Sequence, residues 1–587
     1  MDLSRHSSIA ARFSYALIAG LWVCAACAQE RAPEHPSGWT DKRPVESRHF
    51  MVAAANPLAV DAGYRVLRAG GSAVDAAIAV QLVLGLTEPQ SSGLGGGAFL
   101  LAHDARTHRL FAYDGRETAP AAATPERFLD KHGKPLAFID AVVGGRSVGV
   151  PGVLRLLEAA HRRHGRLAWA ALFAPAIALA ERGFPVSPRL HALIAAESHF
   201  QDRAKAYFLD PAGKPLAAGT ILRNPAYAAT LRRVAHDGAR AFYAGAIAQD
   251  IVATVHAHPT NPGDITLADL ANYRVVVREP VCDTYRRYRV CGMPLPSSGG
   301  LTVLQMLKIL EPYDVTAMGP TTFWSTHFFS EAGRLAYADR GVYEADPAFY
   351  TPPTGLLDDR YLRARSALIT TAGSLGRAAA GTPPERGESA HKIAWGEDAA
   401  LEFPSTSHIS VVDRQGNAVA MTTTIEFAFG SKLMTKSGFL LNNELTDFSF
   451  VPFEDGKPVA NRVEAGKRPR SSLAPTVVYD SAGRVYMIAG SPGGSAIINY
   501  VAKTLVGVLD WHLDPQAAIA LPNVGSRNGP TELEANTRAV ALADKLRALG
   551  HEVRITDETS GLQAIVRTKR GWIGGADPRR EGIVKGD

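Results

Sequence analysis

A threonine at the start of a strongly β-forming segment constrains this chain more than any other feature. Thr406 begins the run 406–413, in which β-branched and apolar residues alternate with polar ones, and a turn leads to a second such run at 418–425. The tract before it, 365–404, shows little periodicity and is rich in Ala, Gly, Ser, Pro and charge. Thr406 is therefore either an ordinary loop-to-strand junction or the first residue of a fragment made by cleavage after Ser405.

Cleavage before Thr406 would solve a problem of chemical activation. A threonine hydroxyl is a weak nucleophile unless a base lies within hydrogen-bond reach. A new α-amine on the same residue titrates near ~7.7–8.0, so part of it is neutral at physiological pH and can accept a proton. One residue would then supply both the nucleophile and the base, without a His or Asp partner.

Several motifs in the chain resemble those of the γ-glutamyltranspeptidases, a family of N-terminal-nucleophile hydrolases. They are TSHISVVD at 406–413, GFLLNNE at 438–444, DFS at 447–449, VGVPG at 148–152, PSSGG at 296–300 and AYADR at 336–340. Members of that family are made as precursors that cleave themselves immediately before the catalytic threonine. The resemblance implies an α+β fold, a four-layer αββα sandwich built from two fragments of one precursor.

The N-terminus has the pattern of a secretory signal. Arg5 and Arg12 precede an apolar run at 13–26, and the small residues that follow predict cleavage after Ala28. A lipoprotein signal at Cys27 and a membrane anchor are the alternatives, although the run is short for a membrane span. We therefore expect an exported protein, periplasmic or secreted, without a stable membrane span.

The resemblance also implies how the chain is divided. A signal peptide at 1–28 is followed by a large subunit at 29–405, mostly helical, with a flexible tail at about 365–405. The small subunit at 406–587 begins with the catalytic threonine and forms a heterodimer with the large one. In the small subunit we expect strands at 408–413, 418–425, 438–441, 476–480, 485–489, 551–556 and 562–568, and a helix at 495–511.

Composition narrows the classes of partner. A formal net charge of +6 over 587 residues is mild, and no basic run carries interleaved aromatic residues, so we expect no nucleic acid partner. Loss of the signal leaves Cys282 and Cys291, which flank a predicted hairpin and are either a disulfide or two isolated thiols. No cluster has ligand spacing, so neither a metal nor a cofactor is expected.

Two further motifs match known signatures but lack the required context. Residues 93–98 satisfy the GxGxxA dinucleotide pattern, yet a helix is predicted before them and a strand after them, the reverse of the required order. These glycines are expected to permit close backbone approach and left-handed conformations. Residues 389–392 match the SxxK of serine β-lactam enzymes without its companion motifs.

The resemblance assigns the catalytic roles residue by residue. Thr406 attacks the γ-glutamyl amide and forms an acyl-enzyme, while the hydroxyl of Thr424 orients it. The backbone amides of Gly493 and Gly494 stabilise the tetrahedral oxyanion, a contribution worth several kcal/mol of barrier.

The binding roles follow the two charges of an α-amino acid. Arg116 with Ser471 and Ser472 would hold the α-carboxylate, because a guanidinium can donate two parallel bonds to one carboxylate. Asp447 and Glu444 would accept bonds from the α-ammonium. An unpaired charge in a closed pocket would be costly, so both sides are needed.

Two departures from the family pattern concern specificity. Glu426 stands where the family often has Asn, so it would either bind the α-ammonium more strongly or repel the α-carboxylate. The segment 448–469 is short and has no Tyr, whereas members with an active-site lid carry a Tyr-bearing loop there. An open site admits water, which favours hydrolysis over transfer to an acceptor amino acid.

The leading interpretation is a self-cleaving γ-glutamyl hydrolase and transferase that acts on small molecules such as glutathione. A glutaryl-type cephalosporin acylase on the same scaffold is the second hypothesis. A non-catalytic exported binding protein is the third, and the intact set of Thr406, Thr424, Gly493 and Gly494 argues against it.

Overall fold

The computed structural model describes residues 37–384, 394–398, 400, 402–403 and 405–587. The predicted signal at 1–28 and the SxxK match at 389–392 lie outside the described residues. Within the described part of the chain, no helix combines the length and the apolar character needed to cross a membrane.

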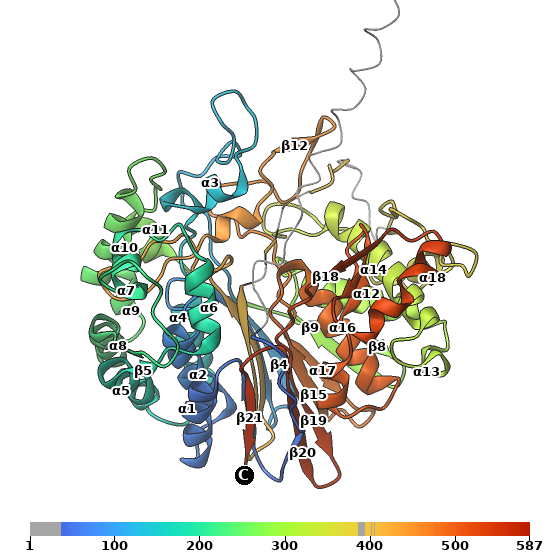
Figure 1. Cartoon of the computed structure of the whole chain (residues 1–587), viewed down its shortest axis with the longest axis horizontal. Helices are drawn as coiled ribbons and strands as arrows, with labels where there is room; N and C mark the ends of the chain where they lie inside the picture. The colour runs from blue at the N-terminus through green and yellow to red at the C-terminus, as the bar shows by residue number, and fades with distance from the viewer. Residues whose placement is uncertain (1–36, 385–393, 399, 401, 404) are drawn as a thin grey trace, which may run out of the picture.

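Two seven-stranded antiparallel sheets form the centre of the molecule (Figure 1). The first sheet has the order β21 (Ile583–Gly586), β2 (Met51–Ala54), β10 (Thr406–Val412), β11 (Ala418–Thr424), β3 (Gly97–Asp104), β4 (Arg109–Gly115) and β7 (Val276–Arg278). The second has the order β1 (Val45–Ser47), β20 (Gly571–Ala576), β19 (Gln563–Thr568), β15 (Val485–Gly490), β14 (Thr476–Tyr479), β9 (Tyr288–Gly292) and β8 (Val281–Tyr285). Both sheets therefore combine strands from before and after Thr406.

Helices cover the outer face of each sheet. The first sheet shares a core with α1 (Pro57–Arg68), α2 (Ala73–Thr87), α4 (Val153–His164), α5 (Ala174–Arg182) and α8 (Pro225–Asp237). The core between the sheets continues to α12 (Gly299–Leu310), α14 (Phe323–Tyr343), α16 (Ile497–Leu509) and α17 (Pro515–Ala520). The order helix, sheet, sheet, helix confirms the predicted four-layer αββα sandwich.

Shorter elements complete the chain. The remaining helices are α3 (Phe138–Val142), α6 (Pro188–Ala196), α7 (Asp202–Phe208), α9 (Arg240–Tyr243), α10 (Ala246–His256), α11 (Leu267–Asn272), α13 (Val315–Met318), α15 (Asp359–Ser366) and α18 (Ala543–Ala548). The small sheets pair β5 (Phe184–Pro185) with β6 (Ile221–Leu222), β12 (Phe453–Glu454) with β13 (Lys457–Pro458), and β16 (Val524–Ser526) with β17 (Thr531–Glu534) and β18 (Val553–Thr556).

Local sequence explains how α2 is placed against the first sheet. Ser72 and Asp75 form a capping box, each side chain accepting a bond from the backbone N–H of the other. Nearly every side chain of α2 is buried, as expected for a helix that is apolar on all faces. The helix contacts both β10 and β11, the two strands that carry Thr406 and Thr424.

One predicted strand is absent, and strands beyond 568 were missed. Residues 438–441 form only isolated bridges, Met434 with Leu440 and Gly95 with Leu441, because Gly438 turns the chain with a φ of +86°. The missed strands are β20 and β21, and β20 reads GWIGGA, a glycine-rich sequence with weak β-propensity.

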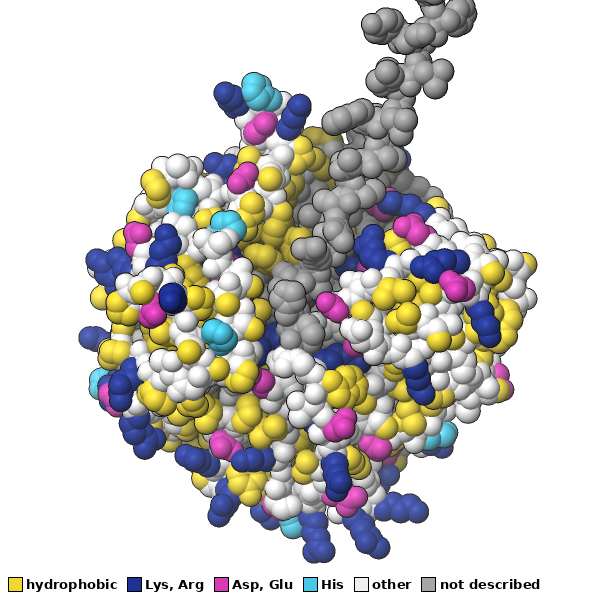
Figure 2. Space-filling view, in the orientation of Figure 1, with side chains coloured by type: hydrophobic (Ala, Val, Ile, Leu, Met, Phe, Trp, Pro, Cys, Tyr) yellow, Lys and Arg dark blue, Asp and Glu magenta, His cyan; other side chains and the backbone are white. Residues whose placement is uncertain are grey.

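The surface of the visible face carries both signs of charge. Figure 2 shows Lys and Arg side chains spread around its outline, interspersed with acidic and neutral groups.

Candidate active site

Strand pairing brings the predicted nucleophile and its partner together. In the β10–β11 hairpin Thr406 lies opposite Thr424, and Thr406 Oγ1 donates to Thr424 Oγ1 at 3.3 Å. Thr424 Oγ1 donates to the carbonyl oxygen of Ser405 at 2.8 Å and accepts a bond from the backbone N–H of Glu426 at 2.8 Å. In this continuous chain, the Thr424 hydroxyl is therefore hydrogen-bonded to the carbonyl of the Ser405–Thr406 peptide bond.

The glycine-rich segment before β3 supports this hairpin. A Cβ on Gly96 would lie 2.1 Å from the carbonyl oxygen of Thr424, and one on Gly95 would lie 2.1 Å from that of Leu440. Close backbone approach is therefore the reason for glycine, as predicted. The accompanying expectation of left-handed conformations is wrong, since none of the four glycines at 93–97 has a positive φ.

Arg116 lies at the end of β4 and contacts two of the predicted acceptors. Its Nη1 donates to Glu444 and its Nη2 to Asp447, and the guanidinium also donates to the carbonyl oxygens of Pro469 at 3.2 Å and Arg470 at 2.8 Å. All three nitrogens therefore have acceptors within the chain. Glu444 Oε2 and Asp447 Oδ1 are buried without a hydrogen-bond partner among the described residues.

Carboxyl groups crowd around this arginine. Burial raises the pKa of Asp447 well above its usual value, although Arg116 opposes the shift. Burial, together with the charges of Asp447 and Glu444, also raises the pKa of Glu426 well above its usual value. Glu117, which the sequence analysis missed, is buried with a raised pKa for the same reasons, burial and then the charge of Glu444.

Glu426 has a backbone φ of +74°, in the left-handed region that a non-glycine residue rarely adopts. Its carboxyl accepts bonds from Asn443 Nδ2 and, at 3.4 Å, from the hydroxyl of Thr446. Observed strain of this kind is concentrated at functional sites, so the position supports a role for this departure from the family pattern.

Ser472 faces an unexpected partner. Its hydroxyl donates to Glu402 Oε2, a residue of the tract before Thr406, and accepts a bond from Arg340 Nη2 at 2.7 Å. Ser471 Oγ accepts from the backbone N–H of Leu473 at 3.2 Å. Sequence reasoning missed Glu402 and the role of Arg340.

The predicted oxyanion glycines follow β15. Gly493 and Gly494 have positive φ values of 142° and 55°, and a short 3₁₀ turn, Gly494–Ala496, leads into α16. A Cβ on Gly493 would lie 2.5 Å from the ring of Tyr500, so a side chain could not be accommodated there.

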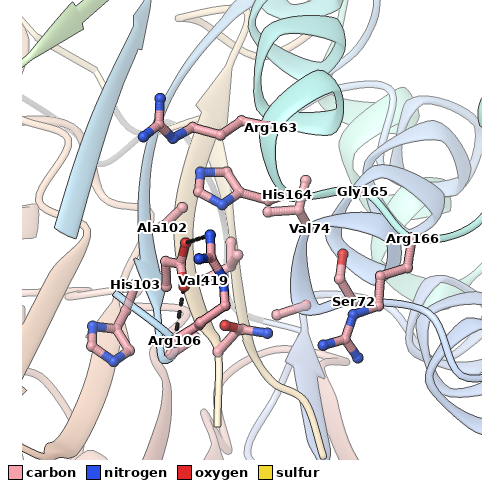
Figure 3. A pocket seen from close by; sticks show the side chains of 14 residues that line it. Ser72, Val74, Ala102, His103, Arg106, Arg163, His164, Gly165, Arg166 and Val419 are labelled. Atoms are coloured by element: carbon pink, nitrogen blue, oxygen red, sulfur yellow. Dashed lines mark hydrogen bonds and ion pairs between the residues drawn. The ribbon is translucent and has the colours of Figure 1, made fainter. Parts of the chain in front are cut away.

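All the predicted catalytic and substrate-binding residues except Gly493 line one small cavity. Its lining includes Arg116, Glu402, Phe403, Thr406, Thr424, Glu426, Glu444, Asp447, Ser471, Ser472 and Gly494. The cavity volume is about 20 Å³, room for about one water molecule. A larger cavity of about 210 Å³ lies at the opposite ends of β3 and β11, between Ser72, His103 and Arg166 (Figure 3), and none of the predicted site residues lines it.

A disulfide and a group of titratable side chains lie away from the small cavity that contains Thr406. A disulfide joins Cys282 and Cys291 across the β8–β9 hairpin. His327, Glu331 and His551 are grouped closely enough to hold a metal ion. The two imidazoles instead bond to each other at 2.8 Å, and their other nitrogens bond to the Thr370 carbonyl and the Thr531 hydroxyl.

Comparisons with known proteins agree with this geometry. A family model described as gamma-glutamyltranspeptidase matches residues 59–586. The glutathione hydrolase proenzyme of Bacillus subtilis (strain 168) is 35% identical over 567 residues, covering 94% of each chain. The acylase ACY 1 proenzyme of Pseudomonas sp. (strain SE83) is 36% identical over 548 residues, covering 91% of this chain and 93% of the relative.

A solved structure shows the same arrangement. The cephalosporin acylase from Bacillus halodurans superposes with a TM-score of 0.80 at 28% identity, covering 93% of this chain and 97% of the other. The fold and the threonine site thus define a hydrolase of the N-terminal-nucleophile type. Within that class, the chain belongs to the γ-glutamyltranspeptidase family.

Proposed function

We propose that this protein is a self-cleaving γ-glutamyl hydrolase and transferase whose nucleophile is Thr406. Cleavage between Ser405 and Thr406 gives a large and a small subunit that remain together as a heterodimer. One observation carries the proposal: Thr406 Oγ1 lies 3.3 Å from Thr424 Oγ1 at the buried start of β10, in a family with relatives named proenzymes.

Self-cleavage uses the peptide bond that precedes the nucleophile. Thr406 Oγ1 attacks the carbonyl carbon of Ser405, a C–O bond replaces the C–N bond, and the hydroxyl proton passes to the nitrogen, which becomes the α-amine. Water then hydrolyses the ester and leaves Ser405 with a terminal carboxylate. Thr424 donates to the Ser405 carbonyl oxygen at 2.8 Å, where negative charge develops during the attack.

The cleaved protein repeats this chemistry on a γ-glutamyl amide such as glutathione. The α-amine of Thr406 takes the hydroxyl proton as Oγ1 attacks, and it returns the proton to the leaving amine. The amides of Gly493 and Gly494 stabilise the oxyanion, and Thr424 orients the nucleophile. Water or an amino acid then accepts the γ-glutamyl group from the ester on Thr406.

Recognition of the donor depends on its charged end. Glu444 Oε2 and Asp447 Oδ1, both buried without a hydrogen-bond partner in the described part of the chain, are suited to accept bonds from an α-ammonium. Ser471 and Ser472 offer hydroxyl groups to the α-carboxylate. Arg116 joins the two serines at the α-carboxylate, and in the uncut chain its guanidinium bonds to Glu444, Asp447 and the carbonyl oxygens of Pro469 and Arg470.

Water is the preferred acceptor in this proposal. The segment 448–469 folds partly as the β12–β13 hairpin, seen at the edge of the molecule in Figure 1, and Phe453 at the start of β12 is 60% exposed. A short hairpin without a Tyr leaves the site more open to water than a closed lid would. The pattern at 1–28 favours export, so the periplasm or the medium is the proposed location.

The decisive test is the chain end of the smaller fragment. The purified wild type should give two bands of roughly 40 and 19 kDa, scaled from 62.6 kDa by residue count, and the smaller should begin with Thr406. Thr406→Ala should give one uncut band and no turnover of γ-glutamyl-p-nitroanilide. An active wild type that is continuous across 405 and 406 would overturn the proposal.

A glutaryl-type cephalosporin acylase is the second candidate. The acylase relatives favour this candidate. Equal turnover of glutaryl and γ-glutamyl anilides would support the acylase, whereas preference for the γ-glutamyl anilide supports the main proposal. Stimulation of that turnover by glycylglycine would show transfer rather than hydrolysis.

A further inference from the structure

A cavity of about 400 Å³, in the size range of small-ligand sites, opens at the end of the sandwich remote from Thr406. Its walls are the β1–β2, β3–β4 and β10–β11 connections and the adjoining ends of β15, β19 and β20. Thr406 begins β10 and Asp413 follows its last residue, so the length of this seven-residue strand, about 20 Å, separates the cavity from the nucleophile. The cavity is therefore distinct from the candidate active site.

Four arginines line this cavity, one from each of four separate stretches of chain. They are Arg48 between β1 and β2, Arg414 in the β10–β11 turn, Arg484 before β15 and Arg567 on β19. Asp413 is the one acidic side chain among the described lining residues, and its oxygens already accept bonds from backbone and amide N–H groups. Figure 2 shows several Lys or Arg side chains along the lower edge of the molecule, where Figure 1 marks the C-terminus.

Arg567 is half-buried without a counter-charge. Its Nε donates to the carbonyl oxygen of Val485 at 2.7 Å, and its guanidinium lies 4.2 Å from the centre of the Trp572 ring. No carboxylate in the described part of the chain lies within ion-pair distance of it. Burial, followed by the positive charge of Arg484, lowers the pKa of Arg567. The protein therefore holds a cation in this wall at an electrostatic cost that a bound anion would relieve.

The other three arginines differ in how they are paired. Arg484 is neutralised by Asp480, with Nη2 at 2.8 Å from Oδ2. Arg414 Nη2 lies 3.8 Å from Asp587 Oδ2, which is a loose contact. Arg48 is exposed and has no ion-pair partner among the described residues. The cavity therefore carries two arginines without a counter-charge and a third that is weakly paired.

The buried histidine of the cavity does not add to this charge. His103 is buried, and its Nδ1 bonds to the Tyr479 hydroxyl at 3.1 Å. Burial, together with neighbouring cationic groups that include His108 and Arg567, lowers the pKa of His103 to about 4. His103 is neutral at physiological pH, so the arginines are the groups available to bind a charged ligand.

The chemistry of these groups favours phosphate. A guanidinium donates two parallel bonds to one phosphate group, and arginines on separate stretches of chain are suited to separate phosphates. Trp572 is only 4% exposed and lies beneath Arg567, so it offers no free face on which a nucleobase could stack. The ligand that fits is therefore anionic at several points and does not need an aromatic base.

We propose that this basic cavity, defined by Arg48, Arg414, Arg484 and Arg567, binds a ligand with several closely spaced phosphate groups. The ligand is either a soluble polyphosphate or the headgroups of a phosphate-bearing lipid surface, which share this chemistry. The inference does not rest on the proposed function, because the cavity lies at the opposite end of the sheets from Thr406.

Binding of inorganic tripolyphosphate to the purified protein, followed by isothermal titration calorimetry, tests the proposal. Arg567→Gln and, separately, Arg48→Gln should each weaken binding at least tenfold, because each removes a charged hydrogen-bond donor. Arg48 is exposed, so its replacement leaves the packing of the cavity intact. Inorganic phosphate should bind at least tenfold more weakly than tripolyphosphate, since a single phosphate cannot reach arginines on separate stretches of chain.

Arg155→Gln is the matched control. Arg155 is also half-buried and lies over an aromatic ring, 4.6 Å from the centre of Tyr243, but it belongs to α4 and does not line this cavity. Its replacement should leave the affinity for tripolyphosphate unchanged, and thermal melts check that all three variants are folded. Equal binding by the wild type, Arg567→Gln and Arg48→Gln would overturn the proposal, as would equal affinity for phosphate and tripolyphosphate.

Sedimentation with vesicles distinguishes the two sources of phosphate. Vesicles of phosphatidylglycerol are compared with vesicles of phosphatidylcholine, whose headgroup has no net charge. Tripolyphosphate binding that both variants weaken assigns a soluble ligand, whereas capture by phosphatidylglycerol vesicles alone, lost in both variants, assigns lipid headgroups. A wild type that binds neither tripolyphosphate nor phosphatidylglycerol vesicles would refute the phosphate site.

Discussion

Replacing Thr424 by Val should slow self-cleavage by about 10²–10³-fold. The Thr424 hydroxyl donates to the carbonyl oxygen of Ser405 at 2.8 Å, and this oxygen becomes the oxyanion when Thr406 attacks. Loss of one donor aimed at such an oxyanion costs about 2.7–4 kcal/mol of barrier. Val has nearly the same shape, so the buried site keeps its packing and the comparison isolates the hydroxyl.

The rate is measured from the intensity of the uncut band over time after a short pulse of synthesis. Thr424→Ser is the matched control, because it retains the hydroxyl and should cleave within about tenfold of the wild type. The Glu426 N–H also loses its acceptor in Thr424→Val, at a cost of about 1–3 kcal/mol in stability. A thermal melt therefore checks that the variant is folded. A folded Thr424→Val that cleaves at the wild-type rate would refute the role of this hydroxyl.

Three further predictions follow from buried charges and from the disulfide. Asp447→Asn should raise KM for the γ-glutamyl anilide at least tenfold, about 1.4 kcal/mol, because Asp447 Oδ1 is free to accept a bond from the ammonium. KM for the glutaryl anilide, which has no ammonium, should stay nearly unchanged. An equal effect on both donors would contradict this role. Replacing Cys282 and Cys291 together by Ser should lower the free energy of unfolding by about 2–3 kcal/mol. This is the loop-closure entropy expected for a disulfide between residues separated by 9 in sequence. A denaturant midpoint equal to that of the wild type would contradict it. Burial raises the pKa of Glu344 from 4.5 to about 8, so the folded protein keeps a proton on Glu344 that the unfolded chain loses at lower pH. The free energy of unfolding therefore falls as the pH rises between these two values. Glu344→Gln should therefore gain Tm relative to the wild type between pH 5 and 8, and parallel Tm–pH curves would show that Glu344 does not titrate this way.

The sequence predicts most of the fold because its strongest signals are local. The β-branched runs on either side of the turn at 414–417 correspond to β10 and β11, and the capping box at Ser72 marks the start of α2. The predicted strand at 438–441 is wrong because a short apolar run does not distinguish a strand from an extended loop that makes single bridges. β20 was missed because its glycines weaken the pattern and its pairing with β19 and β1 compensates for them.

The site residues likewise differ in whether a local sequence pattern reveals them. Thr406, Thr424 and Asp447 stand within motifs, and the structure places all three at one cavity. Glu402 lies in a tract without periodicity, and its partners Arg340 and Arg470 are distant in sequence, so no local pattern connects them. The one available signal was that Arg470 directly precedes the serine pair, as an additional cation beside groups already expected to meet a carboxylate.

The cavity around Thr406 must be stable while the chain is uncut, and it must bind a donor after cleavage. The tract before Thr406 contributes to the first of these requirements. The chain must fold before it can cleave, so the buried guanidinium groups of Arg340 and Arg470 need counter-charges while the chain is intact. Asp398 and Glu402 supply those charges from the segment before Thr406. The Ser405 carbonyl meanwhile receives the bond from Thr424. It follows that replacing Glu402 should harm the uncut chain more than the mature enzyme, an order of effects that an ordinary surface acid on the large fragment would not produce.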